Sequence, residues 1–280
     1  MIHWVGKGLL TILIAYMAFT LLIWSLQRQM LYYPEAELLS SEMLAQTGFA
    51  SVAIPYDQDD TLTAYWKPAS DSDQPVFLHL HGNAGNIAGR LPIYQILAED
   101  GAAVLAVGYP GYGGNSGQPN EEAFYAAAEA HYSWLIAQGI APQRIVIFGQ
   151  SIGTGPAVWL AAQHQAAGLM LEAPYTGIDD IAAQRFPFLP ARWLVKDRYR
   201  NIDRIGKIDM PLLWIHGRQD DLIPYSMGEE LFAAAQAPKT AMTLDQAGHN
   251  DIWAFPIGAA IRREALNFIA KTLATEKPLP

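Results

Sequence analysis

The sequence contains no cysteine and comparatively few positive charges. The absence of cysteine among its 280 residues excludes disulfide bonds and a thiol nucleophile, although it fits any cellular compartment. Lysine and arginine number 18 against 27 aspartates and glutamates, which gives a formal net charge of −9. An acidic chain without a basic patch is repelled by phosphate backbones. We therefore expect no nucleic-acid partner.

Charged residues of both signs are also scarce. They make up 16% of the chain, whereas 51% of the residues are hydrophobic. Such a composition excludes an intrinsically disordered protein and indicates a large buried core. The chain is too short for two full domains together with a membrane segment, and it has no internal repeat or low-complexity linker. We expect one domain, residues 31–280, behind an N-terminal segment of residues 1–30.

The N-terminal segment contains a long run without charge. Residues 9–26 are uncharged, and as a helix they would cover about 27 Å of a hydrocarbon core about 30 Å thick. We predict a single-pass anchor in the inner or plasma membrane, with the lipid bilayer as a partner. A cleaved signal peptide and a buried helix are alternatives, although the run is long for the first and apolar on every face. Lys7 and Arg28 flank it equally and leave the orientation open.

The remainder of the chain alternates between strand and helix patterns. A short helix at 38–48 and a hairpin at 50–66, with its turn at 57–60, come first. Apolar runs then predict strands at 76–80, 103–107, 145–148, 169–171, 212–215 and 240–244. Helix patterns lie near 86–99, 121–138, 151–164, 226–236 and 257–275. Repeated strand–helix units predict an α/β fold with a mostly parallel central sheet and helices on both faces.

The most informative motif is G-x-S-x-G at residues 149–153, placed between a predicted strand and a predicted helix. A serine on this sharp turn needs Gly149 and Gly153 because side chains there would collide with the strand and the helix. The motif alone occurs by chance in about one chain in ten of this size. Its setting makes Ser151 the candidate nucleophile, although a plain tight turn is the alternative.

Possible partners of Ser151 follow it in the chain order serine, aspartate, histidine. This order is typical of enzymes in which a G-x-S-x-G turn joins a strand to a helix. Asp220 comes directly after the predicted strand at 212–215, and His249 follows the one at 240–244. In a parallel sheet such loops share the carboxyl edge, where distant residues can converge. His249 would then act as general base and Asp220 would orient it. Asp221 is a less favoured acid and Asp251 a weaker one, and His249 as an ordinary loop or capping histidine is the alternative to catalysis.

An acyl-transfer site also needs donors for the oxyanion. The amide of Ile152 lies at the predicted helix N-terminus. The loop at 81–86 follows the predicted strand at 76–80, and in enzymes with a G-x-S-x-G turn a loop in the corresponding position supplies the second donor. We expect that donor to be the backbone amide of Asn83.

Three histidines raise the question of a metal site. His79, His81 and His216 are accompanied by neither H-E-x-x-H nor a cysteine pair. We interpret them as buried residues that brace the oxyanion loop, and we expect no metal. Triad chemistry requires only water as second acceptor, so we expect no cofactor.

Between residues 174 and 210 the strand–helix alternation stops. We expect a short cap after the sixth strand, with apolar and aromatic side chains that either line an acyl pocket or pack on the sheet. The segment also carries five basic residues, Arg192, Lys196, Arg198, Arg200 and Arg204. A solvated face is the favoured interpretation of this cluster, and contact with anionic lipid headgroups is the alternative.

Six motifs together resemble those of the membrane-anchored α/β-hydrolases, which include the ABHD-type serine hydrolases. They are HGNAGN at 81–86, GYPGYGGNSG at 108–117, GQSIGTGPA at 149–157, EAPYTG at 172–177, HGRQDDLIP at 216–224 and GHND at 248–251. The resemblance spans nearly the whole chain. It implies an α/β-hydrolase fold, Ser151 as nucleophile, Asp220 as acid, His249 as base, and Asn83 with Ile152 as oxyanion donors. Members include thioesterases of lipidated proteins and lipid esterases.

The expected function is therefore a serine hydrolase of carboxylic esters or thioesters, acting on small-molecule, lipid or acylated-protein substrates. An aminopeptidase or amidase with the same triad is one alternative, and it would need acidic cap residues to hold an ammonium group. A non-catalytic membrane scaffold is the other. The sequence does not indicate the acyl group or the oligomeric state.

Overall fold

The computed structural model describes residues 2–57, 60–254, 258, 260–264 and 267. The two central residues of the predicted hairpin turn, 58–59, and most of the helix expected at 257–275 lie outside these residues. The other predicted strands and helices all fall within the described part of the chain.

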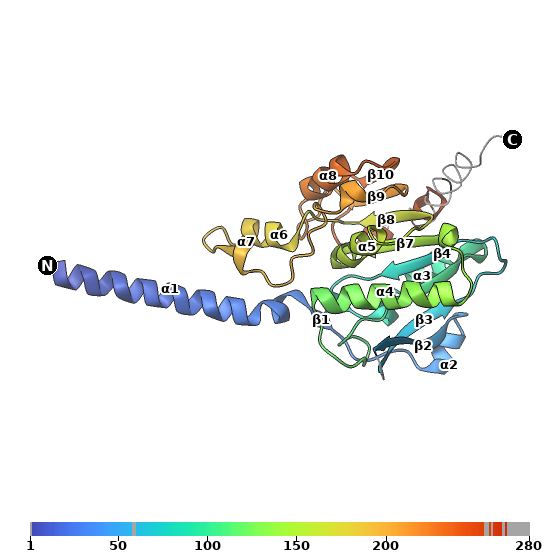
Figure 1. The fold of residues 1–280 in the computed structure, drawn as a ribbon, viewed down its shortest axis with the longest axis horizontal. Helices are drawn as coiled ribbons and strands as arrows, with labels where there is room; N and C mark the ends of the chain where they lie inside the picture. Colours follow the sequence, from blue (N-terminus) through green and yellow to red (C-terminus); the bar gives the residue numbers. More distant parts are fainter. Residues whose placement is uncertain (1, 58–59, 255–257, 259, 265–266, 268–280) are drawn as a thin grey trace.

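The core of the protein is an eight-stranded sheet with strand order β10-β9-β8-β7-β4-β6-β3-β2 (Figure 1). Its strands are β2 (Ala50–Asp57), β3 (Asp60–Lys67), β4 (Val76–Leu80), β6 (Ala103–Ala106), β7 (Ile145–Gln150), β8 (Gly168–Glu172), β9 (Leu212–Gly217) and β10 (Lys239–Leu244). The two strands of the hairpin pair antiparallel, as do β3 and β6, and the other five pairings are parallel. The mostly parallel sheet is thus confirmed.

Helices cover both faces of this sheet. They are α3 (Leu91–Leu97), α4 (Glu121–Ala137), α5 (Thr154–Ala161) and α8 (Tyr225–Ala234). Every residue of β4 is buried, and its side chains alternate between two cores. Leu78 packs in one core with Leu135 of α4, whereas Phe77 packs in the other with Leu97 of α3. A strand buried on both faces reads as a continuous apolar run, and this is why the buried strands β4, β6, β7, β8 and β9 could be predicted from the sequence.

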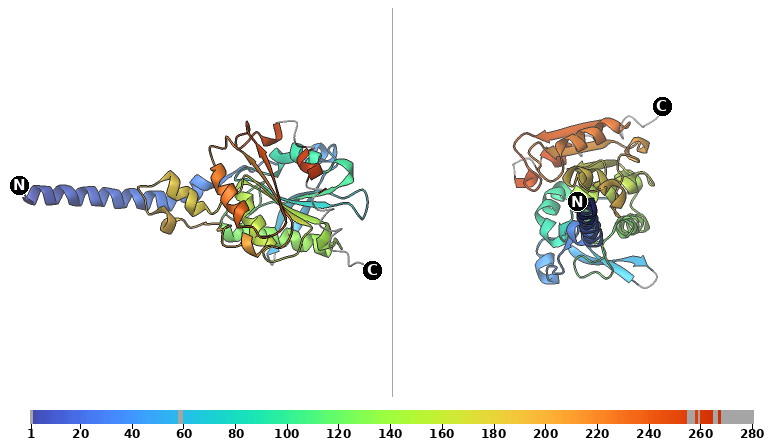
Figure 2. Two further views of the ribbon diagram at one scale, coloured as in Figure 1. Left: turned by 90° about the horizontal axis from the view of Figure 1, so that it is seen from above. Right: turned by 90° about the vertical axis from the view of Figure 1, so that its left-hand side faces the viewer.

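The N-terminal helix α1 (Ile2–Leu31) extends away from the α/β body (Figures 1 and 2). It is longer than the uncharged run at 9–26. Within the described residues, one helix, Trp4–Leu31, is long and apolar enough to cross a membrane; its mean hydropathy is 2.2 and none of its most apolar window is buried. Directly after it, β1 (Tyr33–Pro34) pairs parallel with β5 (Ala84–Gly85). The chain therefore enters the body beside the loop that follows β4.

The interval at 174–210 follows β8, the sixth strand of the central sheet in chain order. It contains α6 (Ile178–Arg185) and α7 (Ala191–Leu194), which lie beside the C-terminal half of α1 (Figure 1). The other short helices are α2 (Ser41–Ala45) and the 3₁₀ segments η1 (Ile87–Arg90), η2 (Glu99–Gly101), η3 (Pro142–Arg144), η4 (Ser151–Gly153), η5 (Ile205–Lys207) and η6 (Ile252–Ala254).

Candidate active site

Ser151 lies on a tight turn between β7 and α5. Its φ of 53° is in the left-handed region, a conformation that costs a residue with a side chain about 1–2 kcal/mol. The flanking glycines are required by close contacts. A Cβ on Gly153 would lie 2.0 Å from the carbonyl oxygen of Leu80, and one on Gly149 would lie 2.6 Å from the Cβ of Ala157.

The structure brings the three candidate triad residues together at the carboxyl edge of the sheet. Ser151 follows β7, Asp220 follows β9 and His249 follows β10. The Nε2 atom of His249 is 2.9 Å from Ser151 Oγ, and its Nδ1 atom is 2.7 Å from Asp220 Oδ2. The rejected alternatives lie elsewhere: Asp221 is exposed, and Asp251 accepts a hydrogen bond of 2.7 Å from the Gly248 amide. The arrangement permits proton transfer from serine to an oriented imidazole.

Asp220 is held by four hydrogen bonds. Its Oδ1 accepts from the amides of Leu222 at 2.9 Å and Ile223 at 2.8 Å, and its Oδ2 is also 3.1 Å from His216 Nε2. Burial works to raise the pKa of Asp220, but the hydrogen bonds from His216 and His249 outweigh it and hold that pKa well below its usual range. The carboxylate is therefore ionised beside the imidazole.

The two candidate oxyanion donors line the same cavity as Ser151 and His249. Ile152 lies in the first turn of η4. Asn83 lies on the loop after β4, where its carbonyl oxygen accepts from Tyr33 N at 3.0 Å and Tyr112 Oη at 2.7 Å. Among the described residues, the Asn83 amide donates no hydrogen bond. The loop is thus fixed through the carbonyl oxygen of Asn83, and not through its amide.

A polar network around the buried Glu172, beside the site, was not predicted from the sequence. Glu172 accepts from Gln150 Nε2 at 2.8 Å and from Trp253 Nε1 at 2.7 Å. Arg90 donates to Gln150 Oε1 at 3.2 Å and to the Ala84 carbonyl at 3.1 Å. Burial raises the pKa of Glu172, and the two donors offset part of that effect. The network joins the serine turn, the oxyanion loop and the segment after His249.

The three histidines weighed as metal ligands have separate environments. The His79 ring packs against Tyr94 and Phe148, and neither of its nitrogens has a hydrogen-bond partner within the described part of the chain. His81 Nδ1 is 2.7 Å from the Gly82 carbonyl in the oxyanion loop, and burial lowers the pKa of His81 to about 3. His216 contacts Asp220. The described residues contain no group of three side chains that could bind a metal ion.

The comparisons with known proteins agree with this fold. A family model described as the alpha/beta hydrolase fold matches residues 75–194. An uncharacterized protein of Mycobacterium tuberculosis is 37% identical over 231 residues, which are 82% of either chain. The human alpha/beta hydrolase domain-containing protein 17B is 38% identical over 181 residues, 63% of this chain and 61% of that protein.

Two solved structures share the architecture at low identity. An esterase of Pyrococcus furiosus has a TM-score of 0.66 and 18% identity, covering 85% of this chain and 98% of its own. Est1E of Butyrivibrio proteoclasticus, with bound ferulic acid, has a TM-score of 0.67 and 19% identity over 78% of this chain and 99% of its own. The chain belongs to the α/β-hydrolase family, and the predicted fold is confirmed.

Proposed function

We propose that this protein is a serine hydrolase that cleaves carboxylic ester or thioester bonds through an acyl-enzyme on Ser151. The observation that carries the proposal is the hydrogen-bonded chain from Ser151 through His249 to Asp220, at the edge of a largely apolar cavity. An ionised Asp220 would stabilise the imidazolium that forms when His249 takes the serine proton.

Each step of the proposed reaction is assigned to a residue. Ser151 Oγ attacks the carbonyl carbon and its proton moves to His249 Nε2. The amides of Asn83 and Ile152 stabilise the oxyanion, and each such donor is typically worth about 2.7–4 kcal/mol. As the intermediate collapses, the leaving alcohol or thiol takes the proton from His249. Water, activated by the same imidazole, then releases the acid and restores Ser151.

The same proposal includes attachment to a membrane. Residues 1–30 form the anchor and residues 31–280 the hydrolase domain, with 174–210 as its cap. The length and hydropathy of α1 support this division. The lipid bilayer is then a partner, and lipid or acylated molecules held in it are the favoured substrates.

The acidic cap residues argue against an aminopeptidase. Such an enzyme needs free carboxylates for the substrate ammonium, whereas these are paired within the protein. Arg200 contacts Asp179 at 3.1 Å and Asp180 at 2.8 Å, and Arg28 contacts Asp197 at 2.8 Å. The basic residues of the cap are thus partly ion-paired with their own segment instead of forming a simply solvated face.

Labelling of the full-length, detergent-solubilised protein with a fluorophosphonate probe tests the proposal. We expect Ser151→Ala to abolish labelling, and Asp220→Asn to slow turnover of an activated ester on the order of 10⁴-fold. Asp221→Asn is the matched control for the acid, and Ser226→Ala, at an exposed serine of α8, is the control for the nucleophile. A folded protein that does not react, or a Ser151→Ala variant that still reacts, would favour the scaffold alternative.

A further inference from the structure

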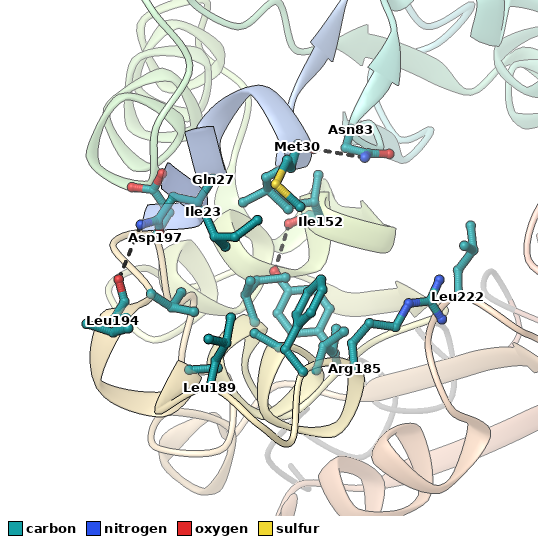
Figure 3. A pocket seen from close by; sticks show the side chains of 18 of the residues that line it. Ile23, Gln27, Met30, Asn83, Ile152, Arg185, Leu189, Leu194, Asp197 and Leu222 are labelled. Carbon is teal, nitrogen blue, oxygen red and sulfur yellow. Dashed lines mark hydrogen bonds between the residues drawn. The ribbon is translucent and has the colours of Figure 1, made fainter. Parts of the chain in front are cut away.

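The cavity beside Ser151 is built from two segments that are far apart in the sequence (Figure 3). It has a volume of about 390 Å³, within the range of small-molecule sites. One wall is α1 and the other is the cap. The apolar side chains that form it include Ile23 and Met30 on α1 and Ile178, Ile181, Leu189 and Leu194 on the cap.

The α1 wall is one face of the helix over three turns. Its lining residues run from Thr20 through Ile23 and Gln27 to Leu31, a spacing of three or four residues that keeps them on the same side. These 12 residues extend about 16 Å along the axis. Leu31 lies at the end near Ser151, and Thr20 lies toward the middle of the apolar run. The cavity therefore continues from the reactive serine in the direction of the proposed bilayer.

Two polar side chains of these walls, Gln27 and Asp197, already have partners, whereas the exposed side chain of Arg185, which also lines the cavity, has no hydrogen bond or ion pair among the described residues. Gln27 donates to the Leu194 carbonyl at 3.2 Å and accepts from the Lys196 amide at 2.7 Å, and Asp197 pairs with Arg28. These hydrogen bonds and this ion pair all run between α1 and the cap. What remains for a ligand along the cavity is mainly aliphatic carbon, with hydrogen-bond donors and the nucleophile at one end.

The helix is bonded to the body near Ser151 and to the cap beyond the outer end of the cavity. Near Ser151, Asn83 Nδ2 donates to the Leu31 carbonyl at 2.9 Å (Figure 3). Farther out, Tyr16 Oη donates to the Phe188 carbonyl at 2.9 Å. The helix is thus a structural part of the site, which a flexible tether would not be.

The outer end of the cap lies at the depth of the apolar run. The rings of Phe19 and Phe188 are 6.4 Å apart, and Phe19 is nine residues, or about 13 Å along the helix, from Arg28. Phe188 and Trp193 are 59% and 81% exposed beside this apolar helix. Exposed apolar side chains at this depth would contact the hydrocarbon of the bilayer beside α1.

We infer that the cavity between α1 and the cap binds the acyl chain of a membrane lipid ester, which enters laterally from the bilayer and presents its carbonyl to Ser151. This inference rests on the proposed function. A lipid in a bilayer holds its ester near the interface and its chain in the hydrocarbon, and the cavity has the same polarity: donors at the body and carbon toward the membrane. On this basis α1 contributes to chain-length selectivity as well as to anchoring.

Paired probes test the acyl site. Full-length protein in phosphatidylcholine nanodiscs is treated with a butyl and a hexadecyl fluorophosphonate, and the labelling rate constants of Ser151 are compared. Ile23→Trp fills the cavity from α1. Leu22→Trp is the matched control, because Leu22 directly precedes Ile23 but is exposed on another face of the helix. We expect Ile23→Trp to slow hexadecyl labelling about tenfold while butyl labelling stays unchanged. Leu22→Trp should alter neither rate.

The outcomes separate this inference from the proposed function. Equal slowing of both probes by Ile23→Trp, or no effect on either, would overturn the acyl site while labelling of Ser151 still supported the hydrolase. Absence of labelling by either probe would overturn both. The same preparations are given a diacyl phospholipid in the nanodisc and, separately, a soluble palmitoyl-thioester peptide. Release of fatty acid from the phospholipid supports lateral entry, and cleavage of the peptide alone contradicts it.

Discussion

At the scale of single residues, the serine turn is the most constrained part of the chain. The left-handed φ of Ser151 is maintained because α5 packs directly against β4 and β7. The contact of Gly153 with the Leu80 carbonyl illustrates the cost of this packing, since any side chain there would displace backbone atoms. The strain is therefore held by surrounding structure rather than by the turn itself.

We expect Gly153→Ala to destabilise the protein by about 1–3 kcal/mol, because the added methyl group would overlap the backbone of β4. The apparent Tm of the detergent-solubilised protein should fall by roughly 2–10 °C. Gly89→Ala is the control, since a Cβ at Gly89 would meet no atom within 4 Å. If both variants melt like the wild type and label at its rate, the close approach at the turn is not required.

The residues of the candidate site could be singled out from the sequence because each follows an apolar run at a recognisable motif, and the structure brings them together. The sequence did not indicate the second partner of Asp220, His216, or the link between Gln150 and Glu172. The side chains of Gln150 and Glu172 lie opposite each other only because β7 pairs with β8 in a register that places Gln150 beside Glu172. A polar residue at the end of an apolar run, Gln150 in β7 and Glu172 in β8, could be noticed in the sequence. Their pairing could not be predicted without the strand order of the sheet.

At the scale of elements, the contact between α1 and the cap joins segments that are 169 residues apart. Arg28 donates through Nε and Nη2 to the two carboxylate oxygens of Asp197, at 2.8 and 2.9 Å. The Asp197 side chain is 5% exposed, whereas that of Arg28 is 47% exposed. Removal of the arginine would therefore leave a buried carboxylate without its cation.

We expect Arg28→Met to destabilise the protein by more than Asp197→Asn, because the first change leaves a charge unpaired and the second leaves a neutral hydrogen-bonding group. The double variant should be less destabilised than the sum of the two, by about 0.5–3 kcal/mol. Thermal melting of the four proteins in one detergent measures this coupling. Strictly additive effects would mean that the ion pair does not hold the cap to α1.

The elements themselves were largely predictable, since buried strands read as apolar runs and α1 as an uncharged one. The end of α1 was not. The helix continues past Gln27 and Arg28 to Leu31 because both polar side chains find partners on the cap. A local pattern cannot indicate such partners. For the same reason the two interpretations of the cap, as acyl pocket or as ordinary packing, were equally favoured by the sequence.

At the scale of the whole molecule, buried histidines tie stability to pH. Burial lowers the pKa of His79 and His81, the latter to about 3, and it lowers the pKa of His131 to about 4. Below the unfolded pKa of about 6.5, the unfolded chain binds protons that the folded protein does not. The contribution of the buried neutral histidines to the free energy of unfolding is therefore complete above about pH 6.5 and is lost as the pH falls below it. The raised pKa of Glu172 acts in the opposite direction above its ordinary value.

We expect the free energy of unfolding to fall by about 2 kcal/mol per buried histidine between about pH 7.5 and about pH 5. Guanidinium titration of the solubilised protein at several pH values measures the slope. His79→Phe removes one titrating group from an aromatic environment, so its slope should be smaller by about one histidine's share. Asp220, whose pKa is depressed, contributes only as the pH falls below about 4. An unchanged slope in His79→Phe would contradict this account.

Under the proposed function, the hydrogen bond from Asn83 to the end of α1 would also connect catalysis to bilayer thickness. An apolar helix that is longer than the local hydrocarbon layer tilts to stay within it. In the membrane-spanning arrangement that we propose, tilting α1 displaces the Leu31 carbonyl, to which Asn83 Nδ2 is bonded. The amide proposed to stabilise the oxyanion belongs to that same residue. The rate of hydrolysis would then vary with the lipid chain length of the host membrane, even for a substrate that never enters it.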